Sequence, residues 1–180
     1  MSTTFTILIA RAIGIGGAFW LSGNIAALAL ISVPACTSAF HDGAATTVSL
    51  TRLWRHTYER GKAQNPPIAA LTTASLSFLA WSTRHVGAPH GSVLRPLYLY
   101  GAAAALTIGI VPYTILTMRG TNNKLIKNSE EIGRQGVAAP ASREEESEVE
   151  ELLGRWMWLN GVRSVLPALG GVAAVVAATI

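Results

Sequence analysis

The 180-residue chain has little of what soluble domains and metal- or nucleotide-binding proteins are built with. Its single cysteine, Cys36, excludes an internal disulfide, and neither a zinc-ligand spacing nor a Gly-rich phosphate loop is present. Only 13% of the residues are charged, compared with about 25% in an average soluble domain. The net charge of +4 comes without the basic cluster that nucleic-acid binding needs. The composition therefore favours a one-domain membrane protein with no nucleic-acid partner.

Half of the residues are apolar, and they gather in four segments. From Ala12 to Ala35 the chain has 24 residues without a charge, enough to cross a bilayer. A cleavable signal peptide is the alternative for this segment, but no basic region precedes it and it exceeds the usual apolar length of about 7–15 residues. We therefore predict an all-α, four-transmembrane-helix bundle. Its expected spans are approximately residues 7–35, 66–84, 97–118 and 156–180.

Two long polar connections lie between these spans. In residues 47–64 apolar and aromatic side chains recur at helical spacing, which predicts an amphipathic helix at the membrane surface between the first two spans. Pro66 and Pro67 are expected to open the second span, and Pro112 to kink the third. The acidic segment 128–150 is expected to be a mobile charged loop or a solvated helix.

The basic residues are distributed unevenly over the connections. Ten of the 14 Lys and Arg residues lie in the connections 36–65 and 119–155, whereas the 84–96 loop has only Arg84 and Arg95. The positive-inside rule therefore places the two long connections in the cytoplasm and both termini in the lumen or exterior. We expect an integral protein of an intracellular membrane of the endoplasmic reticulum type.

The last span opens with three chemically distinctive residues on one helical face. Trp156, Asn160 and Arg163 are at i, i+4 and i+7. An arginine at the centre of a membrane helix costs about 2.5–3.5 kcal/mol, so it is rare unless it faces a partner, a polar cavity or the headgroups. We predict that Asn160 and Arg163 form the floor of a cavity. The alternatives are a simple interhelical hydrogen bond for Asn160 and contact with lipid phosphates for Arg163.

Further residues are predicted to share this cavity, because the segments that carry them end at the same membrane face. They are Trp54, Tyr58, Met118, Thr121, Asn122 and, at middle depth of the first span, Asn24. Two alternatives stay open. The aromatic residues are also typical of a belt at the membrane interface, and the pair Thr121-Asn122 is also typical of the end of a helix. His56, beside the aromatic face in sequence, is the candidate general base, since histidine titrates near neutrality. The four histidines show no metal-ligand spacing, so a metal site requires residues distant in sequence.

The third and fourth spans carry two patterns of fixed spacing. They read Pro112-x-Thr114-x-x-x-Met118-x-x-Thr121-Asn122 and Trp156-x-x-Leu159-Asn160-x-x-Arg163. Two stretches in the first half read Ser22-Gly23-Asn24 to Pro34 and Trp54-x-x-x-Tyr58-x-x-Gly61. Together they resemble the anthrone oxygenase family of small fungal membrane proteins. The resemblance covers most of the chain outside residues 128–150.

The resemblance implies an oxygenase of secondary metabolism that converts an anthrone-type aromatic polyketide to an anthraquinone. Molecular oxygen is the co-substrate and no added cofactor is expected, although the residues leave room for a metal. Loss of a benzylic proton gives a phenolate-like anion, which passes an electron to oxygen, forms a peroxide and loses water. In this hypothesis Asn160 and Arg163 hold the oxyanion and His56 is the base. The substrate-binding residues are Trp54, Tyr58, Met118, Thr121, Asn122, Trp156 and Asn24.

A function of another class is also compatible with the sequence. The chain could be a non-catalytic membrane scaffold or a small-molecule carrier for a biosynthetic pathway, with the charged segment 128–151 as a docking site. In either case the expected partners are the lipid bilayer and a small aromatic polyketide, and self-association into a homo-oligomer stays open.

Overall fold

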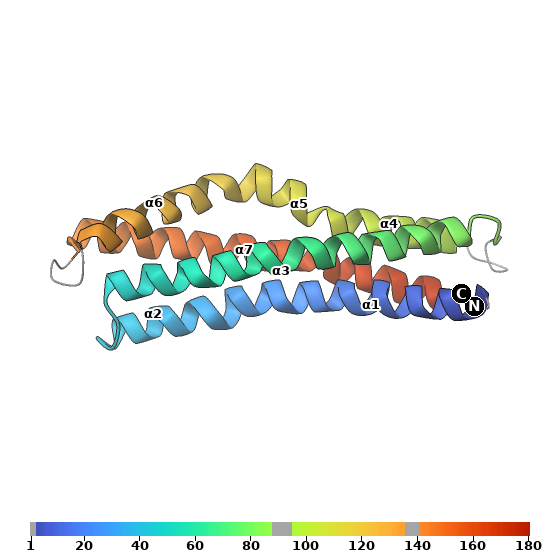
Figure 1. The fold of residues 1–180 in the computed structure, drawn as a ribbon, viewed down its shortest axis with the longest axis horizontal. Helices are drawn as coiled ribbons and strands as arrows, with labels where there is room; N and C mark the ends of the chain where they lie inside the picture. Colours follow the sequence, from blue (N-terminus) through green and yellow to red (C-terminus); the bar gives the residue numbers. More distant parts are fainter. Residues whose placement is uncertain (1–2, 88–94, 136–140) are drawn as a thin grey trace. The chain divides into compact units, whose positions relative to one another are not determined.

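The computed structural model describes residues 3–87, 95–135 and 141–180. In these ranges every regular element is a helix, which confirms the predicted all-α class (Figure 1). The elements in chain order are α1 (Thr3–Ala27), the π-helix η1 (Leu28–Ser32), α2 (Val33–His41), α3 (Thr47–Ser82), α4 (Pro96–Ile108), α5 (Ile110–Tyr113), the π-helix η2 (Thr114–Met118), α6 (Arg119–Gln135) and α7 (Arg143–Thr179).

The helices contribute to two compact units. Unit 1 consists of Met1–Asn24, Gln64–Pro112 and Arg163–Ile180, and unit 2 consists of Ile25–Ala63 and Tyr113–Val162. Each unit has its own cluster of buried apolar side chains.

Within the described part of the chain, three helical stretches are long and apolar enough to cross a membrane, not the four that we predicted. They are Thr4–His41, Pro96–Arg134 and Arg143–Thr179. The predicted second span, 66–84, lies in α3 and at its end, and does not reach the hydropathy of the other three. The reason is its composition, because serine and threonine alternate with its apolar residues.

The amphipathic segment 47–64 is not a separate surface helix, as α3 continues from it through Pro66 and Pro67 to Ser82. The prolines therefore lie inside a helix and do not open one. Proline removes one backbone donor, but surrounding contacts can hold the helix together. One such contact is next to the prolines in unit 1, where the Nδ2 of Asn24 on α1 donates a hydrogen bond of 2.7 Å to Asn65 Oδ1.

Most of the segment 128–150 is helical, so of the two expected states, loop or helix, the structure has the helix on both sides of residues 136–140, which lie outside the described ranges. Helix α7 begins at Arg143, well before Trp156, because Ser142 and Glu145 form a capping box. The backbone N–H of Ser142 donates to Glu145 Oε2 at 2.8 Å, and the N–H of Glu145 donates to Ser142 Oγ at 3.3 Å.

The third predicted span is interrupted at Gly109, between α4 and α5. Pro112 lacks the N–H that would bond to the carbonyl of Ile108, so the helix loses one rung of its hydrogen-bond ladder here. The π-helix η2 follows directly after α5. The chain thus departs from a regular α-helix on both sides of Pro112, where a kink is expected from the sequence.

Unit 1 packs through small residues. Its cluster contains Leu76, Leu79, Tyr100 and six alanines, Ala10, Ala80, Ala103, Ala104, Ala174 and Ala177. Two glycines of α1 lie directly against α3, Gly14 against Leu76 and Gly17 against Thr72. Close helix contacts of this kind are typical of membrane helices.

Replacing Gly17 by alanine is expected to destabilise the protein by about 1–3 kcal/mol. A Cβ at this position would overlap the hydroxyl and the branched carbon of Thr72 and push α1 away from α3. Gly16→Ala is the matched control, because a Cβ there meets nothing within 4 Å. Thermal unfolding in detergent, followed by circular dichroism, should show a lower Tm for Gly17→Ala alone. Equal Tm values for both variants would contradict the close α1–α3 packing.

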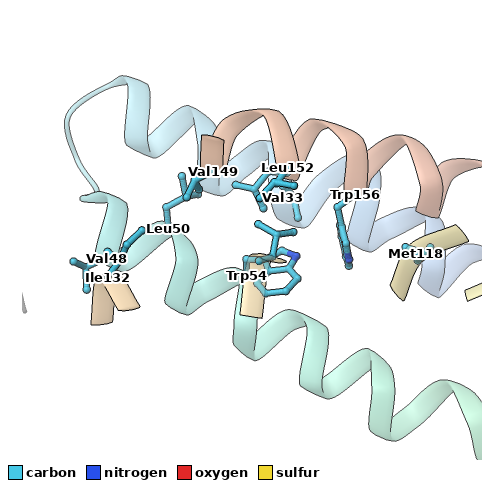
Figure 2. Packing of buried hydrophobic residues seen from close by; sticks show 11 residues of the cluster. Val33, Val48, Leu50, Trp54, Met118, Ile132, Val149, Leu152 and Trp156 are labelled. Carbon is cyan, nitrogen blue, oxygen red and sulfur yellow. The ribbon is translucent and has the colours of Figure 1, made fainter. Parts of the chain in front are cut away.

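Unit 2 has a core of larger side chains (Figure 2). They are Val33, Val48, Leu50, Trp54, Met118, Leu125, Ile132, Val149, Leu152, Leu153 and Trp156. Polar contacts at its rim include the hydrogen bond of 3.1 Å from Thr47 Oγ1 on α3 to Glu146 Oε1 on α7. Arg55 pairs with Glu59 on α3 and with Glu130 on α6. These ion pairs are largely exposed and contribute little, so the apolar core holds the unit together.

Candidate active site

Three aromatic side chains meet in the core of unit 2. Trp54 and Tyr58 are one turn apart on α3, and their rings stack at 5.4 Å with an angle of 17°. The ring of Trp156 on α7 meets Trp54 edge to face, at 6.1 Å and 85°. Figure 2 shows Trp54 and Trp156 extending toward one another from these two helices. The two tryptophans are 1% and 2% exposed, which does not suit residues of an interfacial belt.

The predicted pair Thr121 and Asn122 lies in the same unit. Both side chains are buried on α6, which continues to Gln135, so the pair does not terminate a helix. Asn122 Oδ1 accepts a hydrogen bond of 3.0 Å from Trp156 Nε1. Met118, the last residue of η2, is also buried and belongs to the same core. The structure therefore brings together the predicted residues of α3, η2, α6 and α7.

Asn160 is fully buried one turn after Trp156 on α7. Its Nδ2 donates a hydrogen bond of 2.9 Å to the backbone oxygen of Trp156. The amide must have this orientation, because the opposite one would place two oxygens together. Its Oδ1 has no hydrogen-bond partner among the described residues. In this geometry the Oδ1 of Asn160 is an acceptor available to a ligand, a role that the sequence does not predict.

The two buried indole N–H groups, of Trp54 and Trp156, differ in hydrogen bonding. The N–H of Trp156 donates to Asn122, whereas the N–H of Trp54 has no partner among the described residues. A buried polar group without a partner costs about 1–3 kcal/mol, and each such group in a native structure requires an explanation. The cluster, defined as Trp54, Tyr58, Asn122, Trp156 and Asn160, thus contains two buried atoms without a partner among the described residues, the donor Nε1 of Trp54 and the acceptor Oδ1 of Asn160.

A groove of about 450 Å³ lies in the same unit. It is lined by Ala29, Leu30, Pro34, Met157, Trp158, Gly161 and Val162. Met157 and Gly161 directly follow Trp156 and Asn160 on α7, so the groove and the cluster use neighbouring faces of one helix. Little in the sequence predicts this groove apart from Gly161, a glycine inside the Asn160-x-x-Arg163 pattern.

Comparison with known proteins assigns the chain to a family. The model of the family described as anthrone oxygenase matches residues 54–173, a range that begins at Trp54 and contains the whole cluster. The chain belongs to the anthrone oxygenase family.

Individual relatives cover nearly the whole of this family member. In an alignment over 177 residues it is 37% identical to anthrone oxygenase encC of Aspergillus fumigatus, and the alignment covers 93% of this chain and 91% of the relative. It is 30% identical over 175 residues to anthrone oxygenase AgnL2 of Paecilomyces divaricatus, covering 96% and 94%. A noranthrone monooxygenase of Aspergillus flavus is 28% identical over 153 residues, covering 85% and 65%. No solved structure matches the chain.

Three predicted site residues of this anthrone oxygenase family member are not brought into the cluster. His56 is exposed, and because it follows Trp54 by two residues on α3, it lies about 160° around the helix from the aromatic face. Asn24 and Arg163 belong to unit 1. There Asn24 bonds to Asn65, a buried residue that the sequence analysis missed, and Arg163 is half-buried on α7.

Carboxylate, histidine and cysteine side chains do not gather in the cluster or elsewhere in the described ranges of this family member. Among those residues, no group of three or more could hold a metal ion. The chemistry that the described cluster offers is therefore hydrogen bonding and aromatic contact.

Proposed function

We propose that the protein converts an anthrone-type aromatic polyketide to the corresponding anthraquinone with O2. Membership of the anthrone oxygenase family supports an oxygenase, and the names of the relatives give anthrones as substrates. The observation that carries the proposal for this chain is the buried tryptophan cluster with one unused N–H and one unused amide oxygen. A planar phenolic substrate has aromatic faces, a carbonyl oxygen and hydroxyl groups, which complement these features.

The overall reaction replaces the two benzylic hydrogens by one oxygen atom of O2, and the other oxygen atom leaves as water. A base first takes one benzylic proton, and the electron pair spreads over the ring system to the carbonyl oxygen. One electron passes from this anion to O2, and the resulting radicals combine to a carbon-bound peroxide. Protonation and loss of water from the peroxide then give the second carbonyl group of the quinone. The protein has to hold the anion and favour its formation.

Trp54 is the donor that the geometry offers to this anion. When the benzylic proton leaves, negative charge accumulates on the carbonyl oxygen, and a buried N–H aimed at that oxygen stabilises it strongly. Asn160 Oδ1 would accept a hydrogen bond from a substrate hydroxyl, and Tyr58 and Trp156 would contact the ring faces. Arg163 as an additional cation and His56 as the base remain proposals from the sequence; an exposed His56 would act from outside the cluster.

We place the protein in an intracellular membrane of the endoplasmic reticulum type, with four spans and both termini in the lumen. The start of α1 and the end of α7 lie at the same end of unit 1, as an even number of spans requires (Figure 1). The second half of α3 is the proposed additional span. Two of its hydroxyls are bonded to its own backbone, since Ser75 and Ser82 donate to the carbonyls of Leu71 and Phe78. Such internal bonds lower the cost of placing hydroxyls in lipid.

Oxygen uptake tests the proposed reaction. The purified protein in detergent, given emodin anthrone, should consume O2 and form the quinone faster than the spontaneous oxidation of the same anthrone. A metal analysis of the same sample should accompany the assay, because activity that follows a bound metal would replace the proposed mechanism while keeping the reaction. No uptake above the spontaneous rate, with this and related anthrones, would contradict the proposed function.

A further inference from the structure

The groove of unit 2 opens at an exposed apolar surface. Its seven lining residues come from η1, the start of α2 and α7, and all of them are apolar or glycine. Leu30 and Trp158 at its rim are each 72% exposed. Both η1 and α7 are parts of stretches that are apolar enough to cross a membrane. The groove is therefore accessible to an apolar molecule without any movement of the core.

We propose that this groove admits and holds the planar fused-ring aromatic substrate and presents it to the cluster. The proposal rests on the proposed function, and it adds the place where the substrate binds. The volume of the groove, about 450 Å³, lies within the usual range for small-molecule sites, about 300–1,000 Å³.

Two backbone features border the groove. The lining residues Ala29 and Leu30 lie in η1, and single π-helical turns inside α-helices are frequent at functional sites. On the opposite wall, Gly161 contributes no side chain, and a Cβ built there meets no other atom within 4 Å. A larger residue at position 161 would therefore occupy the groove itself without disturbing the packing of α7.

The lining favours an aromatic occupant over a lipid chain or a second copy of the protein. In a membrane, apolar surface alone gives little preference, because lipid tails are as apolar as the groove. Trp158 offers a flat ring for stacking, and the thioether of Met157 makes favourable contacts with aromatic rings.

Gly161→Leu tests the groove, with Gly154→Leu as its matched control. Gly154 lies two turns earlier on the same face of α7, also has open space around its Cβ, and does not line the groove. The full-length protein in nanodiscs is titrated with emodin by calorimetry, with empty nanodiscs subtracted, and its kinetics with emodin anthrone are measured. For Gly161→Leu we expect at least about a tenfold rise in both Kd and KM, and for Gly154→Leu a change of less than about twofold.

Trp158 provides a second variant that does not depend on filling space. Its side chain is exposed, so Trp158→Ala should fold normally while it weakens emodin binding about fivefold. Trp158→Phe retains a ring for stacking and should restore most of the affinity.

The outcomes separate the groove from the reaction. Wild-type binding and KM in Gly161→Leu, with oxidation intact, would overturn the groove and leave the proposed function standing. The opposite outcome is a wild-type protein that oxidises no anthrone but binds emodin, and a Gly161→Leu variant that does not bind it. This outcome would support the groove as the binding site and overturn the proposed reaction. If Gly161→Leu instead only changes the oligomeric state, or only reduces quenching of tryptophan fluorescence by brominated lipid, the occupant is a second copy or an acyl chain and the proposal fails.

Discussion

Trp54→Phe is expected to lower kcat for anthrone oxidation by about 100-fold, with much less effect on KM. The variant keeps an aromatic ring beside Tyr58 and Trp156 but removes the indole N–H that has no partner among the described residues. Since no protein hydrogen bond is lost, the free energy of unfolding should change far less than catalysis does. The measurement is initial-rate kinetics of O2 uptake with emodin anthrone, together with a thermal unfolding curve of the same preparation.

Trp81→Phe is the matched control for this variant. Trp81 is exposed in unit 1 and carries Arg84 over its ring, so the same chemical change is made away from the cluster. It should leave kcat within about twofold of wild type. A Trp54→Phe variant with wild-type kcat would show that the indole N–H does not hold the developing charge.

Trp156→Ala is expected to have the largest effect on stability, a loss of about 3–5 kcal/mol. Trp156 is buried in the core of unit 2, so its removal would leave a cavity beside Trp54. It would also remove the hydrogen bond that Asn122 Oδ1 accepts. Trp156→Phe retains most of the packing and removes only the hydrogen bond, so it should cost about 1–3 kcal/mol. Unfolding in a mixture of detergent and SDS, followed by circular dichroism, measures both losses.

Trp158→Ala serves here as the stability control, because this exposed residue is two positions further along α7. It should change the free energy of unfolding by less than about 0.5 kcal/mol. If the alanine variants at 156 and 158 were equally stable, the burial of Trp156 and its bond to Asn122 would be contradicted.

The sequence predicts the helical class well but places the ends of the helices poorly. The apolar segments are long and distinct, so their helical state follows from length and hydropathy alone. Hydropathy does not predict the polar ends of these helices, such as the first turns of α7 before Trp156, because it detects only apolar residues. The Ser142-x-x-Glu145 capping box does mark the true start of α7 in sequence, whereas the passage of α3 through Pro66 and Pro67 depends on tertiary contacts.

The site shows the same division between local and tertiary information. Helical spacing correctly groups Trp54 with Tyr58 and Trp156 with Asn160, because residues four apart lie on one face. The same rule argues against His56 as the base, because His56 is close to Trp54 in sequence but lies on another face of the helix. No spacing rule could show which indole N–H is bonded to Asn122, since that depends on how α6 and α7 pack.

The two consecutive prolines inside α3 also have a consequence for the cooperativity of helix formation. Because Pro66 and Pro67 have no N–H, the carbonyls of Lys62 and Ala63 receive no helical hydrogen bond, and the ladder that normally propagates a helix is open there. Helix formation in one half of α3 therefore gives little support to the other. Each half depends on its own neighbours, the first on the core around Leu50 and Trp54 and the second on the contact of Thr72 with α1.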